Sequence, residues 1–97
     1  MRTLPTHHVP YKKTPIFTER TIPAGLLKHH TTKVGAWGKI VVLRGCLRYR
    51  ILAPEVEEIL LTPGLSGIVE PEVPHELCPV RPVEFFVEFY REPSDDA

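Results

Sequence analysis

Histidines are the only concentrated set of chemically reactive side chains in this sequence, which has five of them: His7, His8, His29, His30 and His75. Neutral imidazole nitrogens are good ligands for zinc, iron, nickel or copper. Spacing alone is more typical of hydrogen-bonded or surface histidines than of a shared metal site. On a strand, neighbouring rings point to opposite faces, so only one ring of the His29-His30 pair could enter an enclosed interior.

Other reactive motifs are missing from the sequence. There is no phosphate-binding loop, no nucleophile elbow and no HExxH site, and the few candidate residues do not suggest a Ser/His/Asp triad. Cys46 and Cys78 lie too far apart for a CxxC motif, so the sequence does not predict a zinc knuckle. Any functional site must therefore be assembled by the fold from residues that are distant in the chain.

Short strands are the elements that must position these residues. The 11 prolines and 6 glycines of the 97 residues interrupt every stretch that could form a comfortable helix. In the strand expected at 83–91, Val83, Phe85, Val87 and Phe89 form one apolar face, and 47–51 shows a similar alternation. Seven or so antiparallel strands predict an all-β sandwich or small barrel, the clearest ones at 40–43, 47–51, 57–62, 66–70, 74–78 and 83–91.

The chain length predicts one domain with short terminal extensions. We expect an extended arm at 1–15, a barrel domain at 16–92 and a flexible acidic tail at 93–97. The longest apolar runs are far shorter than a membrane span, and the N-terminal residues do not resemble a secretory signal. We therefore expect no membrane partner and a cytoplasmic location.

Charge is balanced overall but divided along the chain. Residues 1–50 hold ten basic residues and one acid, and residues 51–97 hold two and eleven, so the halves carry +9 and −9. A net charge of zero argues against nucleic acid as a partner. The division has two interpretations, which the sequence does not separate: pairing of basic early strands with acidic late strands, or complementarity between copies in a homodimer.

Two segments resemble the cupin motifs. The run from Gly64 to His75 is similar to the second motif, in which a glycine precedes a histidine by eleven positions, although the internal glycine of its usual ending is absent. His30 followed by 42–45 (Val-Leu-Arg-Gly) resembles the first motif, with one histidine in place of two and without the downstream glutamate. This resemblance implies an all-β, single-domain, cupin-like barrel, that is, a double-stranded β-helix or jelly roll.

A resemblance that covers about residues 10–91 is to the TehB/YeaR-like domain family. It rests on 30–39 (His-Thr-Thr-Lys-Val-Gly-Ala-Trp-Gly-Lys), 42–45, 69–71 (Val-Glu-Pro), His75 and 87–90 (Val-Glu-Phe-Tyr). This small cupin-like family is linked by name to tellurite resistance and occurs alone or ahead of a methyltransferase domain. We expect 97 residues to leave no room for the methyltransferase domain and its glycine-rich loop, so we do not carry methyl transfer over from the resemblance.

The cupin-like resemblance implies a metal site. His30 and His75 would point inward from neighbouring strands and bind one divalent transition metal, with zinc, iron or nickel as the candidates. Most such sites need a third ligand, for which Glu70 or Glu88 is the candidate. For each carboxylate the alternative is a solvated acid or a cross-strand ion pair.

Three hypotheses for function follow. The first is a stress-response module related to tellurite resistance that binds a metal and a small molecule or oxyanion. The second is a metal-dependent enzyme of the oxygenase or isomerase type, in which open coordination positions activate water or oxygen. The third is an interaction domain without metal that forms a homodimer. The absence of an evident general base favours the first over the second.

Overall fold

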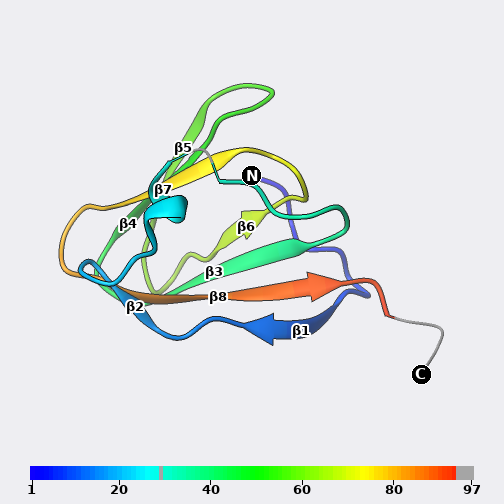
Figure 1. Ribbon diagram of the computed structural model, residues 1–97, viewed down its shortest axis with the longest axis horizontal. Helices are drawn as coiled ribbons and strands as arrows, with labels where there is room; N and C mark the ends of the chain where they lie inside the picture. The colour runs from blue at the N-terminus through cyan, green and yellow to red at the C-terminus, as the bar shows by residue number, and fades with distance from the viewer. Residues whose placement is uncertain (29, 94–97) are drawn as a thin grey trace.

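Eight strands and one short 3-10 turn make up the computed structural model, which describes residues 1–28 and 30–93 (Figure 1). The strands follow the spacing of proline and glycine, as the sequence predicts, and the protein is all-β and folds as a single domain. The elements are β1 (Val9–Lys13), β2 (Phe17–Thr18), η1 (Ala24–Leu27), β3 (Trp37–Arg44), β4 (Leu47–Ile51), β5 (Glu57–Leu61), β6 (Gly67–Val69), β7 (His75–Pro79) and β8 (Glu84–Arg91).

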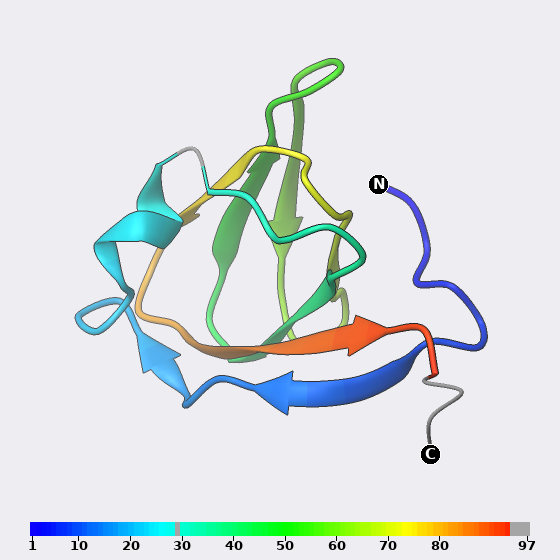
Figure 2. The ribbon, with the colours of Figure 1, turned by 45° about the vertical axis from the view of Figure 1, so that its right-hand side comes forward.

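The strands form two antiparallel sheets. One sheet has the order β1-β8-β3-β6, with β2 also paired to β8, and the other has the order β5-β4-β7. The all-β, single-domain part of the prediction is confirmed, but the described strands form two separate sheets and do not close into a barrel. β2 has only two residues and pairs with β8 alone, and η1 follows it and lies against β7 instead of extending the second sheet (Figure 2).

The core lies between the sheets and follows the alternation read from the sequence. In β4, Leu47, Tyr49 and Ile51 are buried and the two arginines between them are half-buried, which confirms the predicted apolar face of this strand. In β8 and just before it, Val83, Phe85 and Val87 are buried, as predicted. Phe89 is half-buried and packs against the same cluster.

Ion pairs join the basic first half of the chain to the acidic second half. Arg44 on β3 pairs with Glu84 on β8 at 3.0 Å. Arg50 on β4 pairs with Glu58 on β5 at 2.9 Å and with Glu76 on β7 at 3.2 Å. Basic and acidic residues from the two halves of the chain are therefore paired within each sheet, and water screens these exposed ion pairs so that they add little stability.

Two predicted segments lie at the chain ends, and a further expectation concerns a membrane span. Within the segment 1–15, residues Val9–Lys13 form β1, which pairs with β8. Of the tail expected at 93–97, residues 94–97 lie outside the described residues, as does His29. No helix in the described part of the chain has the length and apolar character needed to cross a bilayer.

Candidate functional site

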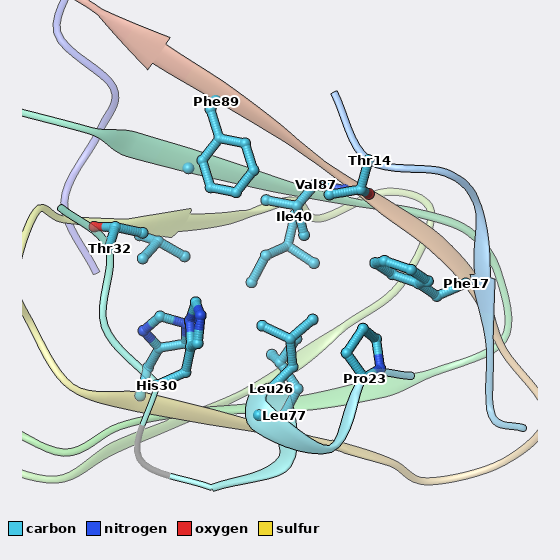
Figure 3. Close-up of a pocket in the computed structure, with 14 residues that line it drawn as sticks. Thr14, Phe17, Pro23, Leu26, His30, Thr32, Ile40, Leu77, Val87 and Phe89 are labelled. Carbon is cyan, nitrogen blue, oxygen red and sulfur yellow. The ribbon is translucent and has the colours of Figure 1, made fainter. Parts of the chain in front are cut away.

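A cavity of about 240 Å³ lies between the two sheets. Both sheets contribute to its walls, and η1 and the loops around it close one side (Figure 3). Most of the lining is apolar, and His30 faces Phe17 across the space. The lining residues are Thr14, Phe17, Pro23, Gly25, Leu26, His30, Thr32, Gly38, Ile40, Val69, His75, Leu77, Val87 and Phe89.

A backbone bridge places His30 beside His75. The His30 amide donates to the His75 carbonyl at 2.7 Å, and the His75 amide donates to the His30 carbonyl at 2.9 Å. Two residues that exchange both hydrogen bonds in an antiparallel pair project their side chains from the same face. The rings consequently meet edge to face, with their centroids 5.2 Å apart.

The two imidazoles are linked to each other and to the backbone. His30 Nδ1 lies 3.4 Å from His75 Nε2, and His75 Nδ1 lies 3.2 Å from the carbonyl oxygen of Val73. His75 is buried, with 3% of its surface exposed. Burial lowers the pKa of His75 and the nearby His30 lowers it further, whereas the hydrogen bond to Val73 opposes the shift. His75 is therefore a neutral imidazole near neutral pH.

The other polar side chains of the cavity are already hydrogen-bonded within the protein. The Thr14 hydroxyl accepts from the Val87 amide at 3.0 Å and donates to the carbonyl of Pro15 at 2.9 Å. The Thr32 hydroxyl donates to the carbonyl of Ala36 at 2.8 Å. The polar end of the cavity is thus the histidine pair.

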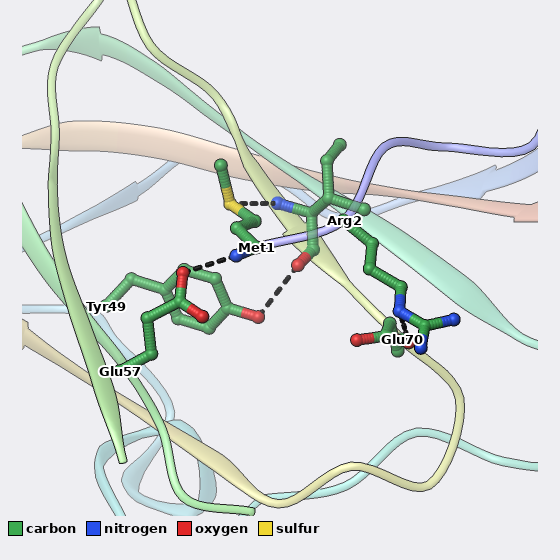
Figure 4. A network of polar contacts seen from close by, with 6 residues as sticks. Met1, Arg2, Tyr49, Glu57 and Glu70 are labelled. Carbon is green, nitrogen blue, oxygen red and sulfur yellow. Dashed lines mark hydrogen bonds and ion pairs between the residues drawn. The ribbon is translucent and has the colours of Figure 1, made fainter. Parts of the chain in front are cut away.

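The two carboxylates proposed as third metal ligands lie elsewhere. Glu70 pairs with the guanidinium of Arg2 at 3.4 Å, close to the contact of the N-terminal ammonium with Glu57 (Figure 4). Glu88 accepts a hydrogen bond from the Tyr90 hydroxyl at 2.6 Å. The described residues contain no group of three histidine, cysteine, aspartate or glutamate side chains that could hold a metal ion.

The sequence predicts only part of the cavity wall. Val87 and Phe89 line the cavity and belong to the apolar face expected at 83–91, whereas Phe17 also lines it and was not predicted to do so. The glycine at position 38, inside a strand, was the available sequence signal for close packing at this wall. A Cβ at this position would meet Val69 Cβ at 3.2 Å and Val87 Cγ1 at 3.6 Å. The neighbouring Trp37 is not part of the lining and instead packs edge to face with His8.

Comparison with known proteins gives the family. The model of the TehB-like domain matches residues 12–87. This chain belongs to the TehB-like domain family. A relative from Haemophilus influenzae strain Rd, named as a probable S-adenosyl-L-methionine-dependent methyltransferase TehB, is 35% identical over 71 residues. The match covers 69% of this chain and 25% of the relative, so the chain spans about a quarter of the length of that protein.

Solved structures agree on the fold of this TehB-like domain. The crystal structure of TehB from Haemophilus influenzae superposes with a TM-score of 0.83 at 32% identity, over 90% of this chain and 32% of that one. A crystal structure of an Escherichia coli K12 protein superposes with a TM-score of 0.87 over 97% of this chain and all of the other. Its identity of 24% supports a shared fold only.

These findings correct the predicted cofactor and function. The expected divalent transition metal is wrong, because the relatives are named for S-adenosyl-L-methionine and the described residues bring no third ligand to His30 and His75. The prediction of a metal-binding cupin module is wrong for the same reason, and so is the alternative prediction of a metal-dependent enzyme. The link of the TehB-like family to tellurite resistance is unaffected by this correction.

The cavity does not fit S-adenosyl-L-methionine either. That molecule carries a sulfonium, an ammonium, a carboxylate and a ribose diol, and buried charges and hydroxyl groups need partners. Among the described residues that line the cavity, the two histidines are the only acidic or basic side chains, and both threonine hydroxyl protons are donated to backbone carbonyls. We therefore assign no methyl-transfer step to this cavity.

Proposed function

We propose that this TehB-like domain binds a compact, largely apolar organic molecule in the cavity between its sheets. The observation that carries the proposal is an apolar space of about 240 Å³ with two convergent imidazoles as its polar end. Small-molecule sites characteristically combine apolar walls with a few well-placed polar groups.

The cavity volume sets the size of the molecule. An apolar cavity of about 150 Å³ is enough to take up benzene. At about 240 Å³, the present cavity has room for a benzene ring with a small substituent. Contact with the aliphatic and aromatic walls supplies the binding energy, at roughly 25 cal/mol for each Å² of apolar surface removed from water.

The relatives suggest where such binding is used. The chain matches about a quarter of proteins named as methyltransferases, and its cavity does not suit their named cofactor. A binding domain that holds a small molecule beside or ahead of methyl transfer accounts for both observations. On this proposal the domain recruits or senses a methyl acceptor and leaves the reaction to another domain or protein.

We further infer that the two sheets are an open jelly roll of the cupin-like kind. The first strand pairs with the last, β3 pairs with β6 and β4 pairs with β5, so the pairs are nested as in a long antiparallel ribbon folded over itself. Jelly rolls arrange eight strands in two such sheets. The short β2, paired with β8 instead of β7, is the departure that leaves one side to η1.

Two matched tryptophan substitutions test the proposed binding. Leu26 lines the cavity, whereas Leu27, the next residue of the same 3-10 turn, does not and is 40% exposed. Leu26→Trp should fill the cavity and abolish binding of toluene and ethylbenzene. Binding is measured from the shifts of backbone amide resonances in NMR titrations. Leu27→Trp should bind both compounds as the native protein does.

The proposal fails on either of two results. One is that neither toluene, ethylbenzene nor phenol shifts the amide resonances of the cavity strands. The other is that Leu26→Trp, shown to be folded by its amide spectrum, binds these compounds with the native affinity. Titration of the same variants with S-adenosyl-L-methionine should leave the cavity resonances unchanged.

A further inference from the structure

The hydrogen bonds around the histidine pair decide which ring nitrogens carry protons. His75 Nδ1 lies 3.2 Å from the Val73 carbonyl oxygen, and a carbonyl oxygen can only accept. Nδ1 of His75 therefore carries the proton. Because His75 is a neutral imidazole, its Nε2 has a lone pair.

The lone pair on His75 Nε2 decides the state of His30. The nearest group is His30 Nδ1, at 3.4 Å. If that nitrogen were also unprotonated, two lone pairs would face each other in a half-buried site. His30 Nδ1 therefore carries a proton and donates it to His75, so neutral His30 has its own lone pair on Nε2.

The chain of donors and acceptors thus runs in one direction, from His30 to His75 and on to the Val73 carbonyl. The remaining ring nitrogen of the pair is His30 Nε2, which in the neutral form of the ring can accept but not donate. The hydroxyl protons of Thr14 and Thr32 are donated to backbone carbonyls, so neither threonine offers a donor to a ligand, and an oxygen of this kind could only accept.

We propose that the cavity selects a molecule whose single polar group donates a hydrogen bond, namely a hydroxyl or thiol attached to a compact apolar body. The proposal rests on the proposed function. A neutral ligand with only an acceptor, such as an ether, would bring its lone pairs against the lone pair of His30. A pure hydrocarbon would fill the same space but leave Nε2 of His30 without a partner.

Proton positions can be measured in the native protein without any ligand. Long-range ¹H–¹⁵N correlation spectra distinguish the two neutral tautomers of each histidine. We expect both His30 and His75 to carry the proton on Nδ1 near neutral pH. A spectrum in which neutral His30 carries its proton on Nε2 would overturn the proposal.

Ligand selection is tested with phenol and toluene, which have almost the same shape and differ in the donor group. The ratio of their dissociation constants is measured for the native protein and for His30→Leu, so that differences in hydration of the two compounds cancel. We expect His30→Leu to shift this ratio about tenfold against phenol, the value of one hydrogen bond to a partly buried acceptor. Leu26→Ala, which changes the apolar wall, should alter both affinities and keep the ratio.

The outcomes separate the two proposals. If both compounds bind and the ratio is the same in the native protein and in His30→Leu, the selection of a donor is refuted while the binding function stands. If neither compound binds to the native protein, both proposals fail. Should His30→Leu not fold, the tautomer spectrum of the native protein still decides the question.

Discussion

Acidification from about pH 7 to about pH 5 should destabilise the folded protein through His75. Removal from water lowers the pKa of His75 in the folded state, and the neighbouring His30 adds to this effect. In the unfolded chain the same ring has its ordinary pKa of 6.5. Below that pH the unfolded state binds a proton that the folded state does not, so the free energy of unfolding falls with pH until the folded-state pKa is reached.

The size of the effect follows from this linkage. One such proton changes the free energy of unfolding by at most about 1.4 kcal/mol for each pH unit. Between about pH 7 and pH 5 the limit is about 2 kcal/mol, reached if the ring stays neutral in the folded state throughout. In a domain of this size, each kcal/mol corresponds to a change of about 4–8 °C in Tm.

Urea unfolding followed by the fluorescence of Trp37, the only tryptophan, provides the assay. The free energy of unfolding is measured across this pH range for the native protein and for His75→Leu. The variant should be less stable at every pH, because the Val73 carbonyl loses its partner, and its pH dependence should be weaker. Ile40→Val serves as the control, since it lowers stability by about 0.5–1.5 kcal/mol without removing a titratable group. Equal pH dependence in the native protein and His75→Leu would refute the reasoning.

Three further outcomes are expected. In thermal unfolding, Gly45→Ala should lower the free energy of unfolding by at least about 2 kcal/mol, because φ is +90° and the new Cβ would lie 2.1 Å from the Pro82 carbonyl oxygen. Gly64→Ala is the control and should change little, because the space around Gly64 is open. Tyr49→Phe should cost about 1–3 kcal/mol in urea unfolding, because the buried hydroxyl donates to the Ile68 carbonyl at 2.9 Å. Sedimentation velocity should give the same assembly state at low and high ionic strength, since ion pairs within the chain join its basic and acidic halves; dissociation in salt would contradict this.

Alternation of apolar and polar residues was sufficient to predict the strands from β3 onward, but not β1 and β2 or how the sheets meet. The inward faces of β4 and β8 could be read directly, because a period of two fixes which residues share a side. Whether a barrel closes depends on hydrogen bonds between strands remote in sequence. Here it depends on two residues, Phe17 and Thr18, which pair with β8 and do not continue to β7. No local pattern reports that choice.

The candidate site, too, could be predicted only in part from the sequence. His30 and His75 are 45 positions apart and are joined by an isolated backbone bridge, so only the family resemblance brought them together in the sequence analysis. The positions of the carboxylates could have been read from alternation. Glu88 lies between Val87 and Phe89, which line the cavity, and Glu70 follows Val69, which also lines it. A side chain adjacent to an inward residue on a strand points the other way.

The cavity has a rigid polar end and a more adaptable apolar side. Reciprocal backbone hydrogen bonds hold His30 and His75 in place before any molecule enters, so little conformational freedom is lost at that end on binding. The apolar wall includes Leu26 on η1, a four-residue turn that contacts β7 and has no buried residue, and the Leu26 side chain packs against the edge of the core. Substitutions in η1 should therefore change which apolar bodies are accepted, whereas the histidine pair should continue to determine which polar group is accepted.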